Sequence, residues 1–101
     1  MEEITVQELK KMQESREDFQ LIDVREPVEH EDANIGGELI PLGDILNHAD
    51  EIARDKKVVV YCRSGNRSGR AIQLLEMHED FDNLYNLKGG ILAYHDAFGN
   101  S

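Results

Sequence analysis

A stretch near the middle of the chain, VVVYCRSGNRSGR at residues 58–70, constrains the fold more than any other segment. Its apolar run, residues 58–61, predicts a strand buried on both faces, as in a parallel sheet. The run ends at Cys62, the only cysteine in the protein. A polar loop follows, and residues 69–79 then have the apolar spacing of a helix. In such a unit the loop N–H groups and the helix N-terminus favour an anion at one point, and Cys62 lies there.

The charge distribution singles out the same segment. The protein has a formal net charge of -10, yet residues 56–75 contain no acidic residue. Basic surroundings lower the pKa of a thiol and stabilise the nucleophilic thiolate, so Cys62 is a candidate nucleophile. The alternative is a buried structural cysteine at a strand end, a common position for this residue. The basic residues of this window are Lys56, Lys57, Arg63, Arg67 and Arg70.

Length and composition limit the class of protein. With 101 residues, the chain is expected to form one domain, residues 1–101, around a single core. No apolar run is long enough to span a bilayer, and the acidic start is unlike a secretory or mitochondrial signal. A single cysteine permits no internal disulfide, which favours a reducing, cytoplasmic setting. The acidic balance argues against nucleic acid and membrane surfaces as partners.

The rest of the chain alternates between helical and strand patterns, which predicts an α/β domain with a largely parallel sheet. Ligands of such sheets bind at the carboxyl ends of the strands, where Arg25 and Cys62 both fall. We expect strands at residues 19–24, 38–40, 58–61 and 84–87, helices at residues 6–15, 27–32, 69–79 and 91–98, and one or two helical turns within residues 44–53.

Asp23 and Arg25, at the end of the first of these strands, are a second pair of candidate site residues. They can serve as a catalytic carboxylate and an anion binder. The favoured interpretation is that they support the site by tying neighbouring loops together through hydrogen bonds. The four histidines do not have metal-ligand spacing, so no metal and no cofactor are expected.

Three separated motifs resemble the rhodanese domain: LIDVREP at residues 21–27, VVYCRSGNRS at 59–68 and NLKGGI at 86–91. The resemblance runs from the first helix to about Ala97. It implies a rhodanese-like α/β fold with a five-stranded, mostly parallel central sheet flanked by helices on both faces. It also implies a sulfurtransferase, in which Cys62 accepts a sulfane sulfur, holds it as a persulfide and passes it to a thiol or cyanide.

The loop residues suit this chemistry. A Cys62 thiolate can attack the outer sulfur of an anionic donor such as thiosulfate and displace sulfite, and no cofactor is needed. Arg63 and Arg67 are expected to neutralise the incoming and departing anions. A protein such as thioredoxin or a desulfurase is a further candidate donor or acceptor. The N–H groups expected to stabilise the persulfide belong to Arg63, Ser64, Gly65, Asn66, Arg67 and Ser68.

Two other functions stay open. Cysteine phosphatases and arsenate reductases have a similar loop, but five residues separate their cysteine and arginine. Only four residues separate Cys62 from Arg67. The tighter ring of N–H groups fits a sulfur atom better than a phosphoryl group. The second alternative is a non-catalytic binding module, because a fold alone does not establish activity.

The chain departs from the family pattern at two places. Residues 34–38, NIGGE, stand where the family commonly has His-Ile-Pro-Gly-Ala, and two glycines permit a different turn. Tyr94 stands where tryptophan is frequent, and tyrosine can fill a similar apolar slot with a polar tip.

Overall fold

The computed structural model describes residues 1–99. The predicted domain extends to residue 101, and residues 100 and 101 lie outside the described part. In chain order the elements are β1 (Glu2–Ile4), α1 (Val6–Glu14), β2 (Gln20–Asp23), α2 (Pro27–Asp32), β3 (Glu38–Leu39), the 3₁₀ helices η1 (Leu42–Asp44) and η2 (Leu46–Glu51), β4 (Val58–Tyr61), α3 (Asn66–Glu79), β5 (Leu84–Leu87) and α4 (Gly90–Phe98).

The five strands form one sheet in the order β1-β5-β4-β2-β3, and every neighbouring pair is parallel. The central strand β4 is completely buried, as its continuous apolar run predicts. Because all strands run in the same direction, their carboxyl ends meet at one edge of the sheet. The predicted α/β class with a five-stranded sheet is confirmed.

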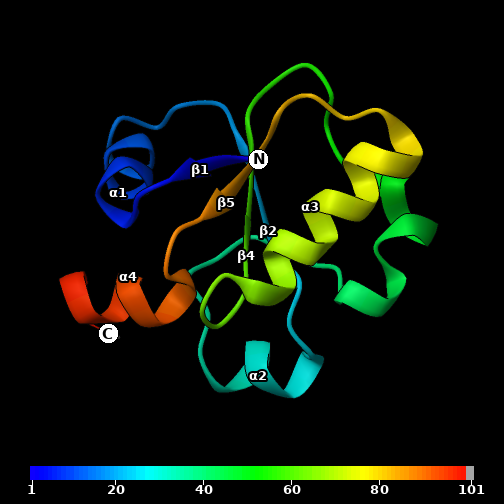
Figure 1. Ribbon diagram of the computed structural model, residues 1–101. Coiled ribbons are helices and arrows are strands. Elements are labelled where there is room, and N and C mark those ends of the chain that lie inside the picture. Colours follow the sequence, from blue (N-terminus) through cyan, green and yellow to red (C-terminus); the bar gives the residue numbers. More distant parts are fainter. Residues whose placement is uncertain (100–101) are drawn as a thin grey trace.

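Helices cover both faces of the sheet (Figure 1): α1 and α4 lie on one face, and α3 with η1 and η2 on the other. The residues of β4 alternate between the two layers. Val58 and Val60 pack with α3, whereas Val59 and Tyr61 pack with α1 and α4. Helix α2 lies beyond the carboxyl edge of the sheet (Figure 1). Among residues 1–99, the helices lack the combination of length and apolar character that crossing a membrane requires.

The sequence pattern did not predict β1. Its first two residues, Glu2 and Glu3, are exposed, and only Ile4 is buried. An edge strand with one buried residue has no apolar alternation from which it can be recognised. Pairing with β5 places it, with Glu2 opposite Tyr85 and Ile4 opposite Leu87.

Helix α3 begins at Asn66, three residues earlier than the predicted start at Gly69. The residue before it, Gly65, has φ +108°, a left-handed conformation that glycine adopts without strain from a Cβ atom. The turn between β4 and α3 is therefore confined to residues 62–65. As a result, Ser68 lies in the first turn of the helix and is completely buried against the sheet.

The unusual segment at residues 34–38 is a turn attached to Tyr61. The Tyr61 hydroxyl donates a hydrogen bond to the Gly36 carbonyl (2.8 Å) and accepts one from the Ile35 N–H (3.3 Å). Gly37 has φ +90°, and a Cβ atom there would lie 2.5 Å from the Leu21 carbonyl oxygen. The second glycine is therefore required by a close approach of two backbones.

Tyr94, at the other departure from the family pattern, is half-buried on α4. Its ring lies edge-on to Phe98, with 5.1 Å between the ring centroids. Its hydroxyl donates a hydrogen bond to Gln13 Oε1 of α1 (2.7 Å). The Tyr94 hydroxyl thus has a hydrogen-bond partner on α1, and this bond connects α4 to α1.

Candidate active site

Cys62 directly follows the central strand, at the carboxyl edge of the sheet. Its Sγ atom accepts a hydrogen bond from the Gly65 N–H (3.1 Å), and the Ser68 Oγ lies 3.4 Å away. The Cys62 backbone is also fixed, because its carbonyl accepts a hydrogen bond from the Ile91 N–H at the start of α4 (2.9 Å). The turn and helix α3 therefore direct hydrogen-bond donors at the only thiol of the chain.

These donors outweigh the effect of burial on the thiol. Burial acts to raise the pKa of Cys62, which is 1% exposed. Hydrogen bonds from the Ser68 hydroxyl and from N–H groups of Ser68, Gly65 and Ser64 hold the pKa below its ordinary value. The surroundings of the sulfur are thus polar on the side of the loop and apolar on the side of the core, where Val60 and Ile72 belong to the same cluster.

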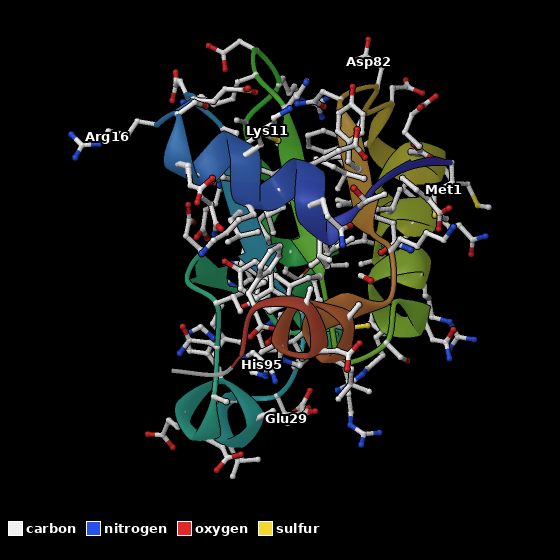
Figure 2. The ribbon with its side chains drawn as sticks, turned by 90° about the vertical axis from the view of Figure 1, so that its left-hand side faces the viewer. Met1, Lys11, Arg16, Glu29, Asp82 and His95 are labelled. Atoms are coloured by element: carbon white, nitrogen blue, oxygen red, sulfur yellow. The ribbon has the colours of Figure 1, made fainter. Side chains whose placement is uncertain are left out.

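The two arginines of the loop lie in different environments. Arg67 is half-buried and makes a two-point ion pair with Glu29 of α2, with Nη1–Oε1 and Nη2–Oε2 distances of 2.7 and 2.8 Å. This pairing lowers the pKa of Glu29 to about 2. Arg63 is exposed, and within residues 1–99 it has no ion-pair partner. Figure 2 shows Glu29 at the lower end of the molecule, opposite Asp82, which precedes β5.

The remaining predicted loop residues surround the sulfur unequally. Ser64 and Asn66 are exposed at the rim of the turn, beside Arg63. Gly65 is half-buried and Ser68 is fully buried, and both contact Sγ. The structure therefore brings Gly65 and Ser68 to the sulfur, while the side chains of Ser64 and Asn66 face the solvent.

Asp23 and Arg25 form a buried cluster at the end of β2. The Arg25 Nε and Nη2 atoms donate to the Asp23 carboxylate at 2.8–3.1 Å, and Nη2 also donates to the Ala33 carbonyl (2.6 Å). His30 Nδ1 lies 2.8 Å from Asp23 Oδ2. Burial acts to raise the pKa of Asp23, but the hydrogen bonds from Arg25 and His30 lower it overall. These contacts tie β2 to α2 and the following loop. Among residues 1–99, no group of three His, Cys, Asp or Glu side chains is arranged to hold a metal ion.

Asn86 of β5 is a site residue that the sequence analysis did not select. Its Nδ2 donates to the Gly65 carbonyl (3.1 Å), and its Oδ1 lies 2.6 Å from the Ser68 Oγ. The side chain is thus attached to both residues that contact the sulfur. A signal was present in the sequence, since Asn86 is a polar residue between the leucines of the predicted strand at residues 84–87.

Comparison with known proteins finds relatives of similar sequence and similar fold. The Bacillus subtilis uncharacterized protein YqhL is 49% identical over 72 residues, which are 70% of this chain and 56% of that protein. A sulfurtransferase of Allochromatium vinosum is 38% identical over 93 residues, covering 91% of this chain and 86% of the relative. The crystal structure of a rhodanese-related protein from Thermoplasma volcanium matches with a TM-score of 0.85 at 27% identity, covering 97% and 94% of the two chains.

The fold and the site together define a five-stranded parallel α/β domain with a hydrogen-bonded cysteine at its carboxyl edge. Residues 5–97 match the family described as the rhodanese-like domain. The chain belongs to this family. Relatives that bear the name sulfurtransferase occur at modest identity.

Proposed function

We propose that the chain is a sulfurtransferase that carries a sulfane sulfur on Cys62. The observation that supports this most is the hydrogen bond from the Gly65 N–H to Sγ, with the Ser68 hydroxyl beside it. These hydrogen-bond donors stabilise the Cys62 thiolate. The thiolate is the form that must attack the compound that supplies the sulfur. A structural cysteine in the core needs no such donors.

The reaction has two balanced steps. The Cys62 thiolate attacks the outer sulfur of thiosulfate, the sulfur–sulfur bond of thiosulfate breaks with both its electrons on sulfite, and the protein holds the outer sulfur as a persulfide anion. A cyanide or thiolate acceptor then attacks that sulfur and regenerates the Cys62 thiolate. A low pKa of Cys62 assists the second step, because the thiolate is then a good leaving group.

Access to the sulfur is narrow. Cys62 is 1% exposed, so a donor reaches Sγ only when the atoms that cover it move. The exposed Arg63 offers its guanidinium to the donor at the rim. Arg67 is shared with Glu29 and contributes less positive charge to the same point.

Thiosulfate is the small donor that we propose, and a protein thiol or persulfide, such as that of thioredoxin or a desulfurase, is the larger one. The exposed rim of the turn is the surface such a partner would meet. The proposal includes a cytoplasmic setting, because a reducing compartment keeps a catalytic thiol free. Nucleic acid and membranes are not among the partners we propose, because the net charge is -10.

The test is turnover with thiosulfate and cyanide, followed as thiocyanate formation. We expect turnover from the unaltered protein and none from Cys62→Ser. The same samples are incubated with an aryl phosphate, for which we expect no phosphate release. Phosphate release without sulfite would instead indicate a cysteine phosphatase.

The deep burial of Cys62 favours one second candidate, a binding module that uses the fold for protein contacts. In that case neither the unaltered protein nor Cys62→Ser would form thiocyanate, and Cys62→Ser would keep the affinity for a partner. The unaltered protein's turnover therefore separates the two functions.

A further inference from the structure

The side chain of Asn86 is buried beside the candidate site, and the proposed reaction gives it no role. It is 5% exposed, comes from β5, and reaches the turn that carries Cys62. Besides Gly65 and Ser68, its hydrogen-bond partner among the described residues is the Met1 Sδ, a weak acceptor at 3.9 Å. A buried amide requires hydrogen-bond partners, so its orientation is determined by what surrounds it.

The Gly65 carbonyl determines that orientation. A carbonyl oxygen only accepts hydrogen bonds, so the Asn86 Nδ2, at 3.1 Å, must face it. The amide oxygen Oδ1 then faces the Ser68 Oγ at 2.6 Å. Rotating the amide by half a turn would place two acceptors against each other at Gly65.

The Ser68 hydroxyl therefore has two acceptors and one proton. The Asn86 Oδ1 lies at 2.6 Å and the Cys62 Sγ at 3.4 Å. A hydroxyl donates one hydrogen bond at a time. While the proton points to Asn86, the sulfur has only the N–H donors of the loop, and a thiolate gains a further donor when the hydroxyl turns.

We propose that Asn86 is a positioning residue that competes with the sulfur of Cys62 for the proton of Ser68. Asn86 acts in a second way as well, because its hydrogen bond to Gly65 fixes the residue whose N–H meets Sγ. Competition for the Ser68 proton withdraws the hydroxyl as a hydrogen-bond donor to the thiolate. The hydrogen bond to Gly65 keeps the Gly65 N–H in place as a donor. An experiment must separate the two.

Of the charged groups near the sulfur, Arg63 is exposed and has no ion-pair partner among the described residues, whereas the following two are paired. Arg67 of α3 is bound to Glu29 of α2, and Asp23 at the end of β2 is bound to Arg25. Strand β5 contributes no charged side chain, and the first turn of α4 contains no acidic residue. None of these groups is changed in the variants below.

The experiment measures the rate of Cys62 alkylation by iodoacetamide as a function of pH in four proteins: the unaltered chain, Asn86→Leu, Ser68→Ala and the double variant. Loss of the Gly65 contact is common to both proteins that carry Asn86→Leu, and it cancels in the comparison. Release of the Ser68 proton occurs only where Ser68 is present. We therefore expect Asn86→Leu to shift the pKa of Cys62 further downward in the unaltered background than in the Ser68→Ala background, by about half a unit or more. Equal shifts in the two backgrounds would overturn the proposal.

The matched control is Asn83→Leu. Asn83 precedes β5, and its Nδ2 donates to the carbonyls of Ala53 and Lys56, away from Cys62. This variant should lose stability without a change in the alkylation profile. If Asn86→Leu does not fold, Asn86→Asp retains the shape and the acceptor for Ser68 but replaces the donor to Gly65 by a negative charge. The added charge and the lost Gly65 contact are common to the unaltered and Ser68→Ala backgrounds, so we expect the pKa of Cys62 to rise more in the unaltered background, where the carboxylate also holds the Ser68 proton, and equal rises would contradict the proposal.

This inference deepens the proposed function and concerns the same cysteine. Alkylation reports only the thiol and not sulfur transfer. An inactive protein with the expected alkylation shifts would refute the sulfurtransferase and keep the role of Asn86. An active protein with equal shifts would do the reverse.

Discussion

Arg63 and Arg67, both expected from the sequence to bind an anion, differ in how free their charges are. Arg67 is held by Glu29 through two hydrogen bonds, whereas Arg63 is exposed. An arginine already neutralised by a carboxylate attracts an incoming anion less than an unpaired guanidinium does. If thiosulfate binds here as proposed, we expect Glu29 to limit the affinity of the site for it.

Replacing Glu29 by glutamine tests this limit. The variant removes the charge that neutralises Arg67. We therefore expect the KM for thiosulfate to fall by about threefold to tenfold, with little change in kcat. This fall in KM corresponds to about 1 kcal/mol of added attraction. The measurement is initial rates of thiocyanate formation over a range of thiosulfate concentrations.

The control is Glu31→Gln, on the same helix. Glu31 is exposed and has no ion pair among the described residues, and its replacement changes the net charge by the same amount. An equal fall in KM in both variants would show that the effect is one of net charge and not of Arg67.

Candidate residues within one local motif could be selected from the sequence, and residues that contact this motif from distant positions could not. Cys62 and its loop were identified because turn chemistry and charge lie within one short segment. Glu29 and Asn86 contact that loop across separations of 38 and 21 residues. The strand order of the sheet determines which residues meet across such separations. A local sequence pattern does not reveal this order.

The start of α4 is the element that holds the cysteine turn in place. The N–H groups of Ile91 and Leu92 donate to the carbonyls of Cys62 and Arg63 at 2.9 and 3.1 Å. Gly90 makes this approach possible: it has φ +62°, and a Cβ atom there would clash with the Arg63 carbonyl oxygen.

A methyl group at Gly90 should therefore separate α4 from the cysteine turn. We expect Gly90→Ala to lower the free energy of unfolding by about 2–4 kcal/mol, since it combines backbone strain with overpacking. Urea unfolding measures the change. Gly43→Ala is the matched control, because nothing lies within 4 Å of its added Cβ atom. A loss at Gly90 no larger than that at Gly43 would contradict this account of the α4 contact.

At the level of elements, segments with a clear apolar pattern were predicted well, and an edge strand and the exact start of one helix were not. The buried strand β4 and the helix α1 match their patterns, and Thr5 and Glu8 form a capping box at the start of α1. β1 was missed because pairing with β5 alone creates it. The early start of α3 follows from the left-handed Gly65, whose conformation depends on the contacts of the turn.

For the molecule as a whole, the acidic surface makes stability depend on pH. The protein has 21 acidic and 11 basic residues, and its sequence pI is about 4.7. Protonating unpaired carboxylates relieves repulsion, whereas protonating paired ones removes attraction. Glu29 is the clearest paired case, with a pKa of about 2 against an ordinary 4.5.

The pH dependence of this pair has a definite sign. The pKa of Glu29 is lower in the folded chain, so its contribution is complete above about pH 4.5 and is lost as the pH falls toward about 2. We expect the unaltered chain to exceed Glu29→Gln in free energy of unfolding by up to about 1 kcal/mol at neutral pH, and the difference to vanish by about pH 2. Urea titrations of both proteins over this range measure it. A difference that does not change with pH would contradict the assignment of this ion pair.

The central claim is that Cys62 is the residue on which sulfur is carried, and intact-protein mass spectrometry after thiosulfate treatment tests it most directly. We predict that the chain gains the mass of one sulfur atom, that cyanide removes it, and that Cys62→Ser never acquires it. An unaltered mass after treatment, or an adduct that persists in Cys62→Ser, would contradict the account.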